Sequence, residues 1–89
     1  MFTKSKSVLF EGKNISVSKE LKFSRDKLKL IIDGKEVDSV RVIYGNTKLR
    51  GEYKKADGSY QQVFVDVYNK GVGIGKCTLN VNGQSFSMK

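Results

Sequence analysis

Apolar and polar residues alternate along most of the chain from Val37 to Lys89, which is the pattern of strands with one buried face. Short turn sequences containing glycine separate the alternating runs, and proline is absent. Pairing the runs across these turns gathers one apolar set on one side of a five-stranded sheet. The predicted inner face consists of Val40, Val42, Tyr44, Leu49, Gly51, Tyr53, Val63, Val65, Val67, Cys77, Leu79, Val81, Phe86 and Met88.

Four turn sequences set the register of this sheet. Gly45-Asn46 and Asn82-Gly83 fit two-residue hairpin loops, which require positive φ angles. Ala56-Asp57-Gly58 and Asn69-Lys70-Gly71 fit three-residue loops closed by a left-handed glycine. All four turns agree on the same inner face, and a slip of one residue would turn a strand's apolar set into water. We therefore predict that this face is the core.

The beginning of the chain predicts one more hairpin. Residues 8–10 and 15–17 are apolar at alternate positions, and Gly12-Lys13 between them fits a two-residue loop. Residues 1–6 carry two lysines and precede the first alternating run, so we expect them to form a frayed basic tail.

Residues 18–27 fit two interpretations. Their loosely helical spacing could open a helix, whereas a short strand at 21–23 and a turn at 24–26 fit the alternation that follows. We favour the strand, and residues 27–32 then form another strand, which turns at Asp33-Gly34 in a three-residue loop. The conformation of residues 18–27 stays open on the sequence alone.

These elements predict an all-β protein with about seven to eight short antiparallel strands in meander order. Such a meander forms either a barrel or a barrel-like two-sheet sandwich. The first strands must cover the apolar face of the later sheet, because that face would otherwise be exposed to water. The chain of 89 residues shows no linker and no repeat, so we predict one domain spanning residues 1–89.

The charge of the chain favours anionic partners. Lysine and arginine number 17 against nine acidic residues, which gives a net charge of +8. Nucleic acid and acidic protein surfaces are the partners that this bias predicts. No apolar run approaches the roughly 18 residues of a membrane span, and no secretory leader is visible. We expect a soluble cytoplasmic protein that does not bind membranes.

Residues that usually carry catalysis are scarce. Histidine is absent, which removes the commonest general base and metal ligand. The single cysteine, Cys77, falls on the predicted core face, where a thiol behaves as a small apolar group. Residues 70–76 have glycine at alternate positions, but their spacing is not that of a phosphate-binding loop and no helix follows. We predict a protein that is not an enzyme and uses no metal or cofactor.

The face opposite the predicted core is basic and carries exposed aromatic residues. The turns place Arg41 directly opposite Arg50, a like-charge pair that destabilises a sheet, with Phe64 beside it. Cations that contact phosphates and rings that stack on unpaired bases are what binding of single-stranded nucleic acid requires. The candidate binding residues are Arg41, Lys48, Arg50, Lys54, Tyr60, Phe64, Tyr68 and Lys76.

Three functions fit this description. We favour a non-catalytic binding module that engages nucleic acid and prefers single strands. A protein-interaction or inhibitor module would instead dock the basic face, or an exposed strand edge, on an acidic protein. A carrier would hold a small ligand in the mouth of the barrel. Fold class does not choose among them, and an edge strand could also pair with its copy in a dimer.

Overall fold

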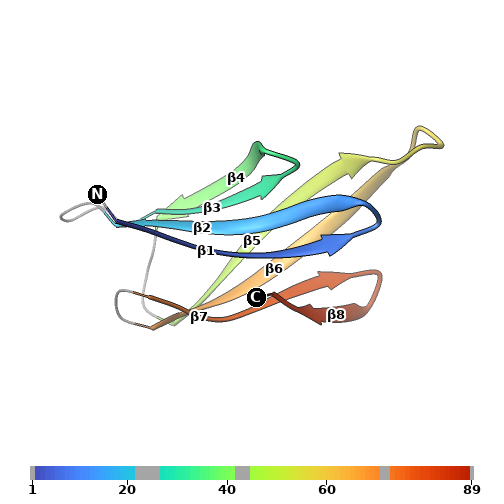
Figure 1. Ribbon diagram of the computed structural model, residues 1–89. Helices are drawn as coiled ribbons and strands as arrows, with labels where there is room; N and C mark the ends of the chain where they lie inside the picture. Colours follow the sequence, from blue (N-terminus) through green and yellow to red (C-terminus); the bar gives the residue numbers. More distant parts are fainter. Residues whose placement is uncertain (1, 22–26, 42–44, 71–72, 89) are drawn as a thin grey trace.

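Two antiparallel four-stranded sheets form two layers in the computed structural model, which describes residues 2–21, 27–41, 45–70 and 73–88 (Figure 1). The first sheet has the order β1-β2-β3-β4 and the second has the order β5-β6-β7-β8. The strands are β1 (Phe2–Phe10), β2 (Lys13–Leu21), β3 (Lys27–Ile32), β4 (Lys35–Arg41), β5 (Gly45–Lys54), β6 (Tyr60–Lys70), β7 (Gly73–Val81) and β8 (Gln84–Ser87). The prediction of an all-β fold is confirmed as a sandwich, since the described strands do not close into a barrel.

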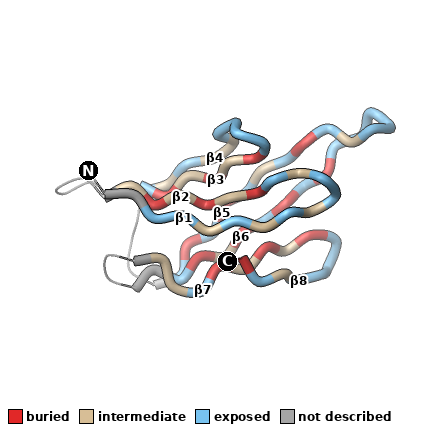
Figure 2. The backbone as a smooth tube through the Cα atoms, in the orientation of Figure 1, coloured by how far each residue is buried: buried red, intermediate tan, exposed pale blue. Residues whose placement is uncertain are grey.

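The core lies between the two sheets, where strands of both layers present alternate residues to each other (Figure 2). Burial of these side chains is the main favourable contribution to folding. The predicted inner face is confirmed for the described strands of the second sheet, whereas Val42 and Tyr44 lie outside the described residues. The buried apolar residues are Ile15, Val17, Leu28, Leu30, Ile32, Leu49, Tyr53, Val63, Val65, Val67, Cys77, Leu79, Val81 and Met88.

Two of the predicted turns are confirmed in the second sheet. Asn82 and Gly83 have φ angles of 50° and 77°, as a two-residue hairpin loop with two left-handed residues requires. In the β5–β6 loop, Gly58 has a φ of 90° and its N–H donates to the carbonyl of Lys55. The Lys55 N–H in turn donates to the carbonyl of Ser59, so the three-residue loop has the predicted pairing.

The predicted hairpin at Gly45-Asn46 is wrong. Both residues belong to β5, where Gly45 is paired with Asn69 and Asn46 with Tyr68. β4 belongs to the first sheet, so the chain passes from one layer to the other between residues 41 and 45. A hairpin here would have extended a single sheet with a bare apolar face, whereas the change of layer lets each sheet bury the other's face.

The predicted β6–β7 register is wrong by an even number of residues. A loop at Asn69-Lys70-Gly71 would set Val65 opposite Gly75, but Val65 is paired with Leu79, and the ladder shifts between Val67 and Asn69. The side-chain period of a strand is two. An even displacement therefore keeps the same residues facing the core, which explains why the inner face is right although the pairs are not.

The beginning of the chain is more ordered than expected. The first hairpin turns at Glu11 and Gly12, with φ angles of 51° and 76°, rather than at Gly12-Lys13, and Val8 is paired with Ile15. Residues 2–6 belong to β1, so the prediction of a frayed tail is wrong for them. Residues 18–21 continue β2 and therefore do not open a helix, whereas of the predicted strand at 21–23 and turn at 24–26 only Leu21 lies within the described residues.

The β3–β4 hairpin contains a bulge. Its loop is the two-residue turn Asp33-Gly34, with φ angles of 51° and 83°, rather than the predicted three-residue loop. Leu30 is paired with Asp38 while the adjacent Ile31 is paired with Glu36, so Val37 is the extra residue of β4. A bulge bends its strand and redirects side chains, and here it brings Val37 against the second sheet.

Side chains connect the two layers where the edge strands β4 and β5 approach each other. A carboxylate oxygen of Asp38 accepts a hydrogen bond from the backbone N–H of Arg50 at 2.9 Å. One residue further along β5, a Cβ built on Gly51 would lie 2.7 Å from Cγ2 of Val37. The close approach of β4 therefore requires glycine at position 51. A glycine within a strand often marks such a close approach.

Candidate binding face

The outer face of the second sheet carries seven of the predicted binding residues. Their outward direction follows from alternation with buried neighbours, such as Leu49 on β5 and Val65 on β6. All seven are exposed to solvent. They are Lys48, Arg50 and Lys54 on β5, Tyr60, Phe64 and Tyr68 on β6, and Lys76 on β7.

Arg41 is separated from these residues. It lies on β4 in the first sheet, where it is paired with Lys27, and not opposite Arg50 as predicted. The predicted like-charge pair of Arg41 and Arg50 is wrong, because β4 and β5 belong to different sheets. Lys76 is not the β7 neighbour of Phe64, since Phe64 is paired with Asn80.

The confirmed register places cations directly beside two of the aromatic rings. Lys54 is paired with Tyr60, and Arg50 is paired with Phe64. Directly paired residues on one face of an antiparallel sheet have Cβ atoms about 4.5–5.5 Å apart. The third ring, Tyr68, is paired with Asn46, so each ring has a polar side chain next to it on β5.

The three rings form a line along the outside of β6, which we call the aromatic row: Tyr60, Phe64 and Tyr68. Their exposed fractions are 62%, 40% and 49%, so none of them is used to fill the core. They recur every four residues, which at the strand rise of about 3.4 Å per residue places them about 13 Å apart. Exposed large apolar groups collected on one surface are typical of an interaction site.

Acidic side chains on the same face are partly engaged by neighbours. Oδ2 of Asp66 accepts a hydrogen bond from the Asn80 amide at 2.9 Å, and the amide oxygen of Asn80 accepts one from the Ser85 hydroxyl at 2.7 Å. Lys48, Arg50, Lys54 and Lys76 form no ion pair with another described residue. These cations are therefore available to an anionic partner.

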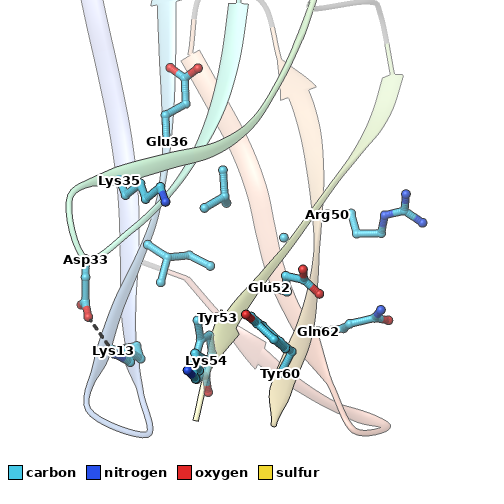
Figure 3. Close-up of a pocket in the computed structure, with 13 residues that line it drawn as sticks. Lys13, Asp33, Lys35, Glu36, Arg50, Glu52, Tyr53, Lys54, Tyr60 and Gln62 are labelled. Carbon is cyan, nitrogen blue, oxygen red and sulfur yellow. Dashed lines mark ion pairs between the residues drawn. The ribbon is translucent and has the colours of Figure 1, made fainter. Parts of the chain in front are cut away.

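An open groove of about 850 Å³ lies between the edges of β4 and β5, next to this face (Figure 3). It brings Lys35 of β4 into the same surface as Lys54 and Tyr60. Lys35 was not among the predicted residues because the groove joins strands of different layers, and no local sequence pattern predicts such a contact. Recognising Asp33-Gly34 as a two-residue turn would have placed Lys35 at the start of β4.

Catalytic and metal-binding groups do not converge in the described part of the chain. No cluster of three or more histidine, cysteine, aspartate or glutamate residues that could hold a metal occurs there. The Cys77 thiol is buried, and burial raises its pKa to about 11, although the charge of Lys6 acts in the opposite direction. A thiol in this state is a poor nucleophile.

A comparison with protein-family models, curated proteins and solved structures finds no match for the chain. Among the described residues, no helix has the length and apolar character that crossing a membrane requires. A functional assignment therefore depends on the geometry of the binding face.

Proposed function

We propose that this protein is a non-catalytic module that binds single-stranded nucleic acid on the outer face of β5 and β6. The observation that carries the proposal is the aromatic row, with Lys54 and Arg50 directly paired to two of its rings. Rings of this kind stack on unpaired bases, while neighbouring cations contact the phosphates.

The spacing of the rings favours single strands over duplexes. Successive bases in a duplex are stacked about 3.4 Å apart and their faces are covered by one another. Rings about 13 Å apart along the outside of one strand cannot enter such a stack. An unpaired strand can separate its bases and place individual base faces on the rings, so the aromatic row discriminates between the two forms of nucleic acid.

The alternatives differ in what they require of the same residues. An acidic protein would interact mainly with the cations and would depend little on a stacking ring. The carrier hypothesis required the mouth of a barrel, whereas the described strands form two separate sheets. The interior between the sheets is occupied by packed core side chains.

The test is fluorescence anisotropy with a short labelled single-stranded oligonucleotide and the variant Phe64→Ala. Loss of a stacked ring costs about 1–3 kcal/mol, so we expect the dissociation constant to rise roughly 5- to 150-fold. The matched control is Leu9→Ala, because Leu9 is an exposed apolar residue, 74% accessible, on β1 of the other sheet. We expect this control to bind like the wild type.

Equal affinity of the wild type and Phe64→Ala would contradict the stacking interpretation. If binding were then retained for acidic polypeptides and lost on charge reversal of Arg50, the protein-interaction alternative would replace it.

A further inference from the structure

The groove between β4 and β5 is continuous with the aromatic row rather than a separate cavity. Its floor is apolar and comes from both layers, including Ile32, Val37 and Tyr53. Its rim on the β5 side contains Lys54 and the β6 residue Tyr60, which belong to the outer face as well. A ligand bound on the outer face can therefore extend directly into the groove.

Lys35 provides the cation on the opposite rim. Its side chain extends from β4 into the space between β4 and β5, whereas Arg50 is directed outward on the far side of β5 (Figure 3). Lys35 is exposed and forms no ion pair with a described residue. Lys35 and Lys54 thus face the groove from different sheets.

The acidic residues around the groove do not neutralise these two cations. Asp33 pairs with Lys13 at 3.3 Å, and Glu36 lies 3.4 Å from Nζ of Lys29, which it shares with Glu20 at 2.7 Å. Glu52 is the remaining carboxylate of the lining. Arg50 is directed outward, so Lys35 and Lys54 are the two cations without an ion pair that face the groove, beside one such carboxylate, and this balance favours an anion.

The edge of β5 adds backbone donors. None of the described strands pairs with β5 on the groove side, and the Arg50 N–H on that side is already bonded to Asp38. In an antiparallel strand, backbone groups directed to one side recur at every second residue. The N–H of Glu52 therefore points toward the groove, where an anionic oxygen could accept a hydrogen bond from it.

The position of the groove relative to the rings identifies which part of a nucleic acid it would receive. Neighbouring strands lie about 4.8 Å apart, so a base stacked on the β6 ring of Tyr60 can place its sugar and phosphate over the neighbouring strand β5 or beyond it. On that side lie Lys54, the edge of β5 and the groove with Lys35.

We propose that the groove receives the phosphate backbone of a single strand whose bases stack on the aromatic row, and that Lys35 is a phosphate-binding residue. This inference rests on the proposed function. It adds a binding residue from the first sheet and fixes the orientation of the strand, with its bases over β6 and its phosphates toward β4.

The experiment compares Lys35→Gln with Lys27→Gln, because both lysines are exposed on strands of the first sheet and both changes remove one charge. Binding of a labelled single-stranded oligonucleotide is measured by anisotropy at several salt concentrations. One phosphate contact contributes about 0.7 to the slope of log affinity against log salt for single strands. We expect Lys35→Gln to lower the slope by about 0.7 and Lys35→Arg to retain it, while Lys27→Gln keeps the wild-type slope.

The outcomes separate the two proposals. If the wild type binds and Phe64→Ala weakens binding, but Lys35→Gln and Lys27→Gln have equal slopes, the groove inference is overturned and the proposed function stands. If the wild type binds no single strand, both are overturned. A smaller slope in Lys35→Gln alone, with a melting temperature like that of the wild type, supports the groove as a phosphate site.

Discussion

The contact between Gly51 and Val37 shows how a single position determines the distance between the layers. Cγ2 of Val37 and Cδ2 of Leu30 lie 2.7 and 3.1 Å from the position of a Cβ on residue 51. Any larger side chain must displace these groups, which belong to a packed interior with little free volume. The same contact forms one end of the groove, because Gly51 and Val37 both line it.

Gly51→Ala is expected to destabilise the protein by about 1–3 kcal/mol, since overpacking a well-filled core has a cost of this size. Urea unfolding measures the change. The same substitution in a Val37→Ala background should cost less, because the clashing methyl group is absent, and the difference gives a coupling energy. Equal costs in the two backgrounds would show that Val37 does not restrict position 51.

At the scale of strands and turns, local chemistry predicted two hairpin loops correctly, whereas the loops at Gly12-Lys13 and Asp33-Gly34 were misplaced or given the wrong length, and the connection between the layers was missed. The turns at Asn82-Gly83 and Ala56-Asp57-Gly58 are as predicted, because positive φ angles are required there and few residues adopt them. Gly45-Asn46 has the composition of such a turn but lies within β5. At this point the burial of two apolar sheet faces against each other outweighs the local turn preference. Such burial depends on the whole fold, so no short segment of the sequence predicts it.

One property of the candidate site, the direction in which its side chains point, could be predicted from the sequence. The outward direction of Lys48, Arg50 and Phe64 depends only on strand parity, which register errors of two or four residues leave unchanged. Their actual neighbours depend on the register itself and were partly wrong, as the separation of Arg41 shows. Lys35 could not be assigned to the site because it approaches β5 from the other layer.

The turn between β3 and β4 is linked to β2 through a carboxylate, and this link is expected to respond to acid. Oδ1 of Asp33 accepts the Asn14 N–H at 2.8 Å, and Oδ2 lies 3.3 Å from Nζ of Lys13. The hydrogen bond, followed by the lysine, lowers the pKa of Asp33 although partial desolvation opposes them. Its contribution to stability is therefore complete above the unfolded pKa of about 3.9 and is lost as the pH falls through the lower folded value.

Urea unfolding between about pH 6 and pH 2 tests this link, with Asp33→Asn as the comparison. The variant should be less stable than the wild type at the upper end, and the difference should shrink as the wild-type carboxylate becomes protonated. Asp57, whose pKa is also lowered, titrates in both proteins and cancels in the difference. A difference that stays constant over the whole range would contradict the assignment.

At the scale of the whole molecule, the two sides of the sandwich are closed in different ways. On one side, β1 and β7 are joined by the Lys6 ammonium, which donates to the carbonyl of Gly75 at 2.7 Å, and the rings of Phe10 and Phe86 lie 5.3 Å apart. On the other side, the Asp38 carboxylate accepts the Arg50 N–H, Val37 approaches Gly51, and the groove opens beside these contacts. The groove adjoins the outer face of β5 and β6, which carries the paired cations and rings.

The central claim is that the outer face of β5 and β6 binds unpaired nucleic acid through stacked bases. The most direct measurement is anisotropy of one oligonucleotide sequence, presented as a labelled single strand and as the corresponding duplex, over a range of salt concentrations. We expect the single strand to bind more tightly and its affinity to decrease as salt increases, since phosphate contacts release counterions. Equal affinity for both forms, or tighter binding of the duplex, would contradict it.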